Sequence, residues 1–508
     1  MHFNFGQRPF AYTPPTGYKA LCTTNLPNPT VADGSTAFDA SLYTGNGSTQ
    51  SISGFNFQPD FVWIKSRTSA GHHSLNDSVR SAGKILYSNL TNAEATSSIM
   101  LTAFNSTGFS VGSDNDVNKN NDSFVSWAWD AGTSNTSISA GGLNSATYNQ
   151  SQDWSGGSVT GATNSGGGWD NAFDGAFGTG AFTYATNTST LTMPSNTTWS
   201  NKFEVYALKY GGTLYINGTD VGASMTGFTS TAQWHDITSI VGSSGTLSSI
   251  GVSDVGTNYV KLFAVRLDGK LLVDSGESVT NVPSLTSTVR ANASAGFSIV
   301  EYTGNASNST VGHGLGASPE FIIIKLREDS SGWPVYHDAI GTSSSNYIEL
   351  QDSAGSSQDN TAFQNTAPSS NVFSIGTKAA VNNNGDSHIA YCFAPVAGYS
   401  AFGSYTGNGS SDGPFVYTGF RPKYLLIKRT NSSKAWQVMD TKRDPSNVAD
   451  TSLFPAGSET EATTSSYDID FLSNGFKIRT SHDSRNGSSD NYIYACFASH
   501  PFKTSRAR

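Results

Sequence analysis

The sequence predicts an all-β protein made of tandem β-sandwich modules, with three repeats and an inserted jelly-roll-like β-sandwich. Three observations favour this fold class. The chain has 508 residues, 52 of them Gly, and is rich in Asn, Ser and Thr. Only 13% of its residues are charged, against about 25% in typical globular proteins, which argues against disorder. Short apolar segments alternate with Asn/Gly/Ser turns, and one apolar segment recurs three times, so a strand-rich repeat protein is indicated.

The recurring segment is a proline followed by an apolar run and a lysine. It reads PDFVWIKSR at 59–67, PEFIIIKLR at 319–327 and PKYLLIKRT at 422–430. Each copy begins with YTGN and ends with a strand of the type FVSWAWDA, HIAYCFAP or YIYACFAS. Because the run is almost wholly apolar, we expect a strand buried on both faces, and the proline, which lacks an N–H, stands at its first position. Trp63 is replaced by Ile323 and Leu426 in the other copies, which indicates core filling.

Charged residues also recur at fixed positions in the repeat. A lysine lies six residues after each proline, and an aspartate follows the proline by 18 or 19 residues. We expect the lysine to carry its charge to water at the strand end and to pair with the aspartate, or the aspartate to pair with a nearby arginine. The predicted structural ion-pair residues are Lys65, Asp77, Arg80, Lys325, Asp338, Lys428, Asp440 and Arg443.

The repeats divide the chain into segments. We predict an N-terminal arm at 1–31, repeat 1 at 38–132, a linker at 133–149, the inserted domain at 150–285, repeat 2 at 290–396 and repeat 3 at 397–504. The inserted segment contains GTLYINGTDVG and VRLDGKLLVDSG, whose Asn-Gly and Asp-Gly turns are typical of hairpins. A separate jelly-roll-type sandwich is therefore expected there.

The inserted segment also contains four of the nine tryptophans. Sugars present flat C–H faces that stack on aromatic rings, and carboxylates and carboxamides bind their hydroxyls. The predicted glycan-binding residues are Trp169, Asp170, Trp154 and Trp234. Trp169 lies in the Gly-rich stretch GGGWDNAFDG and is expected to be exposed, while packing in the core is the alternative for all three tryptophans.

Charge and cysteine content exclude several classes of function. The net charge is −9, and no basic run stands out beyond the terminal KTSRAR, so a nucleic-acid partner is not expected. No segment approaches 18 uninterrupted apolar residues, so membrane insertion is not expected. Cys22, Cys392 and Cys496 form no disulfide framework or metal-ligand spacing, and the last two occupy one repeat position where Ala is the alternative.

No cofactor, metal or catalytic residue is predicted. The loop SDNDVNKNND at 113–122 could hold calcium, but a solvated turn is the favoured interpretation because the spacing of an EF-hand is missing. A glycosidase needs two carboxylates across a cleft. The candidate pairs, Asp170 with Asp174 and Asp114 with Asp116, lie in turns where aspartate usually caps the backbone.

The N-terminal stretch NFGQRPFAYTPPTGY at 4–18 is similar to the closing strands of SPRY domains. A full domain of that kind needs a long upstream segment. The stretch is interpreted as an extended arm that docks onto another chain, with a shortened SPRY-containing relative as the alternative.

The order of these parts resembles structural proteins of tailed bacteriophages of marine bacteria, especially tail-fibre or other virion-appendage proteins. The resemblance rests on YTGN…PDFVWIK, the trailing NGSSDNYIYACFA and the DNAFDG…LLVDSG insert. It implies a virion protein assembled in the bacterial cytoplasm and released by lysis. Its expected function is that of a tail fibre or receptor-binding adhesin, a homotrimer contacting host surface polysaccharide.

Two other functions stay open at this point. One is a virion component without receptor contact, such as a capsid decoration, horn, collar or tail-assembly protein. The other is a polysaccharide depolymerase, which is disfavoured because the chain lacks the short repeat of a long β-helix.

Overall fold

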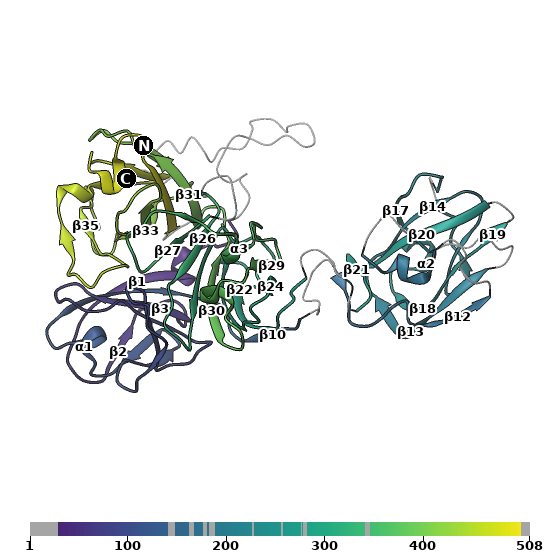
Figure 1. Cartoon of the computed structure of the whole chain (residues 1–508), viewed down its shortest axis with the longest axis horizontal. Coiled ribbons are helices and arrows are strands. Elements are labelled where there is room, and N and C mark those ends of the chain that lie inside the picture. The colour runs from purple at the N-terminus through teal and green to yellow at the C-terminus, as the bar shows by residue number, and fades with distance from the viewer. Residues whose placement is uncertain are drawn as a thin grey trace, which may run out of the picture. The chain divides into compact units, whose positions relative to one another are not determined.

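The computed structural model confirms the all-β fold (Figure 1). It describes residues 29–140, 148–161, 167–175, 180–181, 188–225, 228–255, 258–275, 277, 282–340 and 346–498. Most of the predicted arm and part of the predicted linker therefore lie outside the described residues. The chain divides into two compact units, one holding all three repeats and the other running from Ile138 to Leu285. Among the described residues, no helix has the length and apolar character needed to span a membrane.

Each repeat folds into a module with a large antiparallel sheet and a smaller sheet. In module 1 the large sheet has the order β1-β9-β3-β4-β5-β6 and the small sheet β2-β8-β7. Its elements are η2 (Gly34–Thr36), β1 (Phe38–Thr44), β2 (Gln50–Ser53), β3 (Phe61–Ser66), β4 (Ser74–Asp77), β5 (Lys84–Tyr87), β6 (Ala95–Thr96), β7 (Leu101–Asn105), β8 (Gly108–Val111), α1 (Asn115–Asn118) and β9 (Ser123–Trp129). The central strand β3 is buried along its whole length, as its apolar run predicts.

Modules 2 and 3 repeat this arrangement. The large sheets have the orders β10-β22-β23-β30-β25-β26-β27-β28 and β31-β39-β33-β34, and the small sheets β24-β29 and β32-β38-β37. Module 2 contains β22 (Ser287–Asn292), β23 (Phe297–Thr303), β24 (Ser309–Gly312), β25 (Phe321–Leu326), β26 (Pro334–His337), β27 (Asn346–Glu349), β28 (Ser357–Gln358), α3 (Asn360–Phe363), β29 (Val372–Ile375), α4 (Ala379–Asn382) and β30 (Ser387–Phe393). Module 3 contains β31 (Ser400–Thr406), β32 (Phe415–Tyr417), β33 (Pro422–Arg429), β34 (Gln437–Asp440), β35 (Thr451–Ser452), β36 (Ala462–Thr463), η4 (Ser465–Tyr467), β37 (Ile469–Leu472), β38 (Gly475–Ile478), α5 (Asp483–Asn486) and β39 (Asn491–Ala498). The edge strand β10 (Thr136–Ile138) lies within the segment predicted as a linker.

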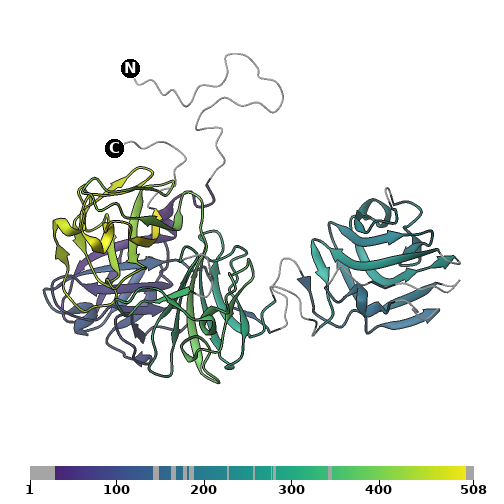
Figure 2. The same cartoon turned by 45° about the horizontal axis from the view of Figure 1, so that its top comes forward.

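The three large sheets share one hydrophobic core. The same face of each central strand supplies it, through Phe61 and Trp63, Phe321 and Ile323, and Tyr424 and Leu426. The opposite face of β3, formed by Val62 and Ile64, packs against the small sheet of module 1. The repeats are therefore not independent sandwiches joined end to end, and the three modules lie side by side in one unit (Figures 1 and 2). Trp63 is 2% exposed, which confirms its role in the core.

The recurring aspartates of modules 1 and 3 pair with arginines. Asp77 accepts from Nε of Arg80 at 2.5 Å, and Asp440 accepts from Nε of Arg443 at 2.6 Å, with all four side chains fully buried. Asp77 also accepts a hydrogen bond of 2.8 Å from the hydroxyl of Tyr391, which belongs to module 2. Each aspartate thus compensates a buried guanidinium within its own module, and Asp77 also connects two modules.

Module 2 departs from the predicted pattern because His337, not Asp338, occupies the equivalent position. Phe321, the first residue of β25, pairs with His337, just as Phe61, the first residue of β3, pairs with Asp77. Asp338 lies one position further along and is exposed. Nε2 of His337 donates to the carbonyl of Tyr494 (3.0 Å), and Nδ1 accepts from the N–H of Ala339 (3.1 Å). The imidazole is therefore neutral, and burial lowers its pKa to about 4.

The prediction for the three recurring lysines is wrong. Lys65, Lys325 and Lys428 are fully buried, and their ammonium groups bond to backbone carbonyls instead of reaching water or the aspartates. Lys325 donates to the carbonyl of Thr91 in module 1 (3.1 Å), and Lys428 donates to that of Ser353 in module 2 (2.8 Å). Burial lowers the pKa of each lysine to about 8. In modules 2 and 3 the strand-end lysine therefore connects its module to the preceding one, whereas Lys65 donates to the carbonyls of Ser66 and Ser69 in its own module.

The inserted domain is a sandwich of two mainly antiparallel sheets. One sheet has the order β11-β21-β20-β14-β17, with β19 paired to β20, and the other has the order β12-β13-β18-β15-β16. The elements are β11 (Tyr148–Asn149), β12 (Ser158–Gly161), η3 (Trp169–Ala172), β13 (Ser189–Trp199), β14 (Phe203–Lys209), β15 (Leu214–Ile216), β16 (Thr219–Asp220), β17 (Gln233–Asp236), α2 (Thr238–Val241), β18 (Gly245–Val252), β19 (Asp254–Val255), β20 (Asn258–Leu267) and β21 (Lys270–Leu272). Its core lies between the two sheets and includes Phe203, Val205, Leu247 and Ile250.

Candidate functional site

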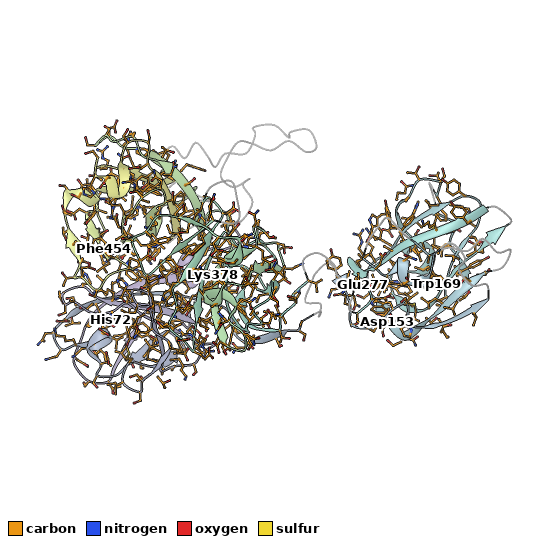
Figure 3. The ribbon with its side chains drawn as sticks, in the orientation of Figure 1. His72, Asp153, Trp169, Glu277, Lys378 and Phe454 are labelled. Atoms are coloured by element: carbon orange, nitrogen blue, oxygen red, sulfur yellow. The ribbon has the colours of Figure 1, made fainter. Side chains whose placement is uncertain are left out.

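Two of the predicted glycan-binding tryptophans lie in the core of the inserted domain. Trp154 is 1% exposed, and its Nε1 donates to the carbonyl of Asn149 at 2.7 Å. Trp169, labelled in Figure 3, is 5% exposed, and its Nε1 donates to Oγ of Ser189 at 3.3 Å. The prediction that Trp169 is exposed is wrong, because the Gly-rich stretch forms the turn η3, which places the indole in the core cluster. Asp170, the next residue of that turn, is exposed.

Trp234 is the predicted glycan-binding residue that lies on an outer sheet face. Alternation along β14 directs Phe203 and Val205 to the core, so Tyr206 faces outward. Tyr206 pairs with Trp234 of β17 on one side and with Ala264 of β20 on the other. Three neighbouring strands therefore present one row of side chains on the outer face.

The rings in this row contact one another. Tyr206 lies 5.4 Å from Trp234 and 5.6 Å from Phe263 between ring centroids, with interplanar angles of 50° and 64°. Tyr148 and Trp234 pack at the edge of a small outer cluster of Ala264, Leu271 and Val273. We call the group of Tyr148, Tyr206, Trp234, Phe263 and Ala264 the aromatic face. Tyr148, Tyr206 and Trp234 are partly exposed in it, whereas Phe263 and Ala264 are buried. The tilted ring contacts are of the kind that stabilises aromatic pairs.

A charged row borders the aromatic face one step along the strands. Glu204 pairs in register with Asp236 and Arg266. Its carboxylate accepts from Nε of Arg266 and from Nζ of Lys202, both at 2.8 Å. Burial alone would raise the pKa of Glu204, but these two hydrogen bonds outweigh it and hold the pKa below its usual value. The carboxylate therefore stays ionised and fixed beside the rings.

The guanidinium of Arg266 joins the two rows. Its Cζ lies 4.1 Å from the centre of the Trp234 ring, within the range of a cation–π contact. One face of the indole is therefore covered by a cation that is itself held by Glu204. Aromatic rings next to fixed hydrogen-bonding groups can contact a sugar through its C–H face and its hydroxyls together.

Only one residue of the aromatic face, Trp234, is predicted from the sequence. The segment KFEVYALK at 202–209 carries the alternation that places Glu204 and Tyr206 opposite Phe203. That pattern could have identified an outward Tyr206. The register of β14 against β17 and β20, which brings in Trp234 and Arg266, depends on long-range pairing that the alternation leaves open.

The predicted turn interpretation fits the acidic loop of module 1. Asp114 caps α1 by accepting from the N–H of Asp116 at 2.8 Å, and Asp116 accepts from the N–H of His72 at 3.0 Å. Burial raises the pKa of Asp116. Within the described part of the chain, no group of three or more His, Cys, Asp or Glu residues could hold a metal ion.

Comparisons with known proteins give a family but no described function. The chain belongs to the family described as "Domain of unknown function (DUF7483)", whose profile matches it twice, at residues 33–262 and 272–501. No curated protein sequence matches the chain. Among solved structures, a truncated AlyQ with CBM32 and alginate lyase domains is similar with a TM-score of 0.15 and 10% identity, covering 66% of this chain and 95% of that one. A TM-score this low supports no functional inference.

Proposed function

We propose that this chain is a structural protein of a tailed-bacteriophage virion that contacts host surface glycans through the aromatic face of its inserted domain. The virion part of the proposal is supported by the resemblance of the module and insert motifs. Self-association as a homotrimer and docking to other virion proteins through the N-terminal arm belong to the same proposal. The glycan part is supported by the side chains of the inserted domain.

The observation that carries the glycan contact is the aromatic row beside fixed charges. Trp234 and Tyr206 lie 5.4 Å apart on adjacent strands, and the Glu204–Arg266 pair lies one register step away. Both rows stand on strands of a packed sandwich, so little side-chain entropy is lost when a ligand binds. Rigid aromatic anchors are the residues that most often dominate binding energy.

The direct test is binding of the full chain to an array of bacterial surface polysaccharides. We expect Trp234→Ala to weaken glycan binding by about 30-fold, which corresponds to a loss of about 2 kcal/mol at an aromatic anchor. Tyr210→Ala is the matched control, because Tyr210 is a 49% exposed aromatic residue of the same domain whose ring contacts Tyr259 in a tilted arrangement instead. Equal binding by wild type and Trp234→Ala, or no binding by wild type, would contradict the proposed contact.

A virion component without receptor contact is the second candidate. It is favoured by the cations that lie over the rings: Arg266 over Trp234 at 4.1 Å and Lys261 over Phe263 at 5.1 Å. These cations reduce the ring surface that a sugar could contact. Electron microscopy of virions labelled against this chain separates the candidates, since a capsid location favours the second and a tail-fibre location the first. Release of reducing sugar from a polysaccharide would instead favour a depolymerase.

A further inference from the structure

The three modules meet at three joints that share one backbone contact. The residue before a short strand (β6, β36 or β28) donates its N–H to the carbonyl at the end of the next module's central strand. These contacts are Glu94 to Arg327 (2.7 Å), Glu461 to Arg67 (2.9 Å) and Ser356 to Thr430 (2.7 Å). They identify equivalent residues at the joints between modules 1 and 2, 3 and 1, and 2 and 3.

The joint between modules 1 and 2 is filled by a cluster of charged side chains. Nε and Nη2 of Arg327 donate to the two carboxylate oxygens of Glu94 at 2.9 and 3.0 Å, and Nη1 of Arg80 donates to the same carboxylate at 3.2 Å. Burial alone would raise the pKa of Glu94, but the two arginines outweigh it and hold the pKa below its usual value. We call this arrangement the Arg–Glu–Arg clamp.

The joint between modules 3 and 1 carries the same clamp. Nε and Nη2 of Arg67 donate to Glu461 at 2.8 and 2.7 Å, and Nη1 of Arg443 donates at 3.1 Å. The loop of module 3 that reaches this joint includes Phe454, labelled in Figure 3. Two of the three joints are therefore closed by bidentate ion pairs, which fix geometry as well as contribute energy.

The clamp is missing from the joint between modules 2 and 3. Thr430 and Ser356 occupy the positions of the bidentate arginine and of the glutamate, and Ile340 stands in module 2 where Arg80 stands in module 1. All three residues line a cavity of about 460 Å³. The smaller side chains thus leave open, at one joint, the space that charged side chains fill at the other two.

The lining of this cavity is polar but uncharged. Hydroxyl and carboxamide groups come from Ser356, Ser404, Thr406, Thr430, Asn431 and Asn491, and apolar surface comes from Ile340 and Tyr405. Ser404 stands where module 2 has Glu301, a carboxylate that accepts from the clamp residue Arg327. No charged side chain is among the described residues that line the cavity.

The charged residues next to the cavity are already paired. Nη2 of Arg429 donates to Asp490 at 2.6 Å, and the carboxylate of Asp490 also accepts from the side chain of Asn431 at 3.1 Å. A charged ligand would lose its hydration without gaining an unpaired partner, which is costly. A neutral ligand with many hydroxyls and apolar C–H faces matches both parts of the lining. The volume lies within the range of small-molecule sites.

The geometry points to the joint between modules 2 and 3 as a binding site for a neutral mono- or disaccharide. The site is separate from the aromatic face, since it lies in the unit that holds the three repeats. It goes beyond the proposed function and does not depend on it. One module joint is in this way specialised for a ligand, while the other two hold the unit together.

The test is saturation-transfer NMR and titration of the full chain with D-glucose, D-galactose, N-acetyl-D-glucosamine and lactose, with D-glucuronate as the charged comparison. Ser356→Glu/Thr430→Arg installs at this joint the bidentate pair found at the other two. We expect the wild type to bind at least one neutral sugar and this double variant to bind it at least tenfold more weakly, with a higher unfolding temperature. Binding of D-glucuronate in preference to every neutral sugar, or no binding of any neutral sugar, would overturn the inference.

A second pair of variants keeps the test decisive if the double variant fails to fold. Ser404→Ala and Asn491→Ala truncate exposed side chains at the cavity and are expected to weaken sugar binding at least fivefold. Asn308→Ala, an exposed asparagine of module 2 outside the cavity, is the control and should bind as the wild type does. Trp234→Ala should also retain this binding. If Trp234→Ala lost sugar binding and the cavity variants retained it, the site at the joint would be refuted. The proposed glycan contact at the aromatic face would then be supported.

Discussion

The buried aspartate of module 3 offers the sharpest test of how the modules are held together. Asp440 accepts from Nε of Arg443 (2.6 Å) and from Nε1 of Trp127 in module 1 (3.0 Å), and also from the N–H groups of Lys442 and Arg443. Burial alone would lower the pKa of Arg443, but Asp440 and then Glu461 outweigh it and keep the pKa above its usual value. Replacing Asp440 by Asn removes the charge that compensates this guanidinium. We expect a loss of about 3–5 kcal/mol in the free energy of unfolding.

A double-mutant cycle separates the charge effect from the loss of hydrogen bonds. Asp440→Asn, Arg443→Met and the double variant are compared by urea unfolding at pH 7, with the two compact units fitted as separate transitions. The double variant should lose clearly less free energy of unfolding than the two single variants lose together, because it leaves no uncompensated charge within the pair. Asp412→Asn is the control, since that carboxylate is 80% exposed and its loss should not change stability measurably. A cost below about 1 kcal/mol for Asp440→Asn would refute the reasoning.

Three further outcomes are expected. The pKa of Glu94 is lowered from 4.5 in the folded chain, so its stabilising effect is present above pH 4.5 and is lost as the pH falls further. The difference in the free energy of unfolding between wild type and Glu94→Gln, measured in urea, should therefore shrink towards acid pH. A difference that grows towards acid pH would contradict the clamp. The pKa of His337 is lowered from 6.5 to about 4, so between those pH values the unfolded chain takes up a proton that the folded chain does not. As the pH falls through that interval, the free energy of unfolding of the wild type should decrease by roughly 3 kcal/mol more than that of His337→Gln. Burial raises the pKa of the thiols of Cys392 and Cys496, so a Cys22→Ser variant should react with Ellman's reagent only after denaturation, and rapid reaction in the native state would show that these thiols are accessible.

The sequence alone was sufficient to predict the all-β fold class and to identify the three repeats. Apolar runs between Asn/Gly/Ser turns identified the strands, and the recurrence of Pro59, Pro319 and Pro422 identified three equivalent modules. Trp63 could be assigned to the core because its counterparts are aliphatic. These conclusions depend only on local chemistry: a strand has a period of two, a turn needs particular residues, and a buried position keeps its apolar character across copies.

The tertiary structure decided which side chains are buried and with what partners. Lys65 was expected to reach water and is fully buried, and Trp169 was expected to be exposed and is 5% exposed. Trp127 and its partner Asp440 lie 313 residues apart in the chain. Strand alternation determines which side chains share a face. Whether that face contacts solvent, another sheet or another module depends on contacts between distant segments. For the same reason, the clamp at two joints and the cavity at the third become visible only when the three modules are placed around one core.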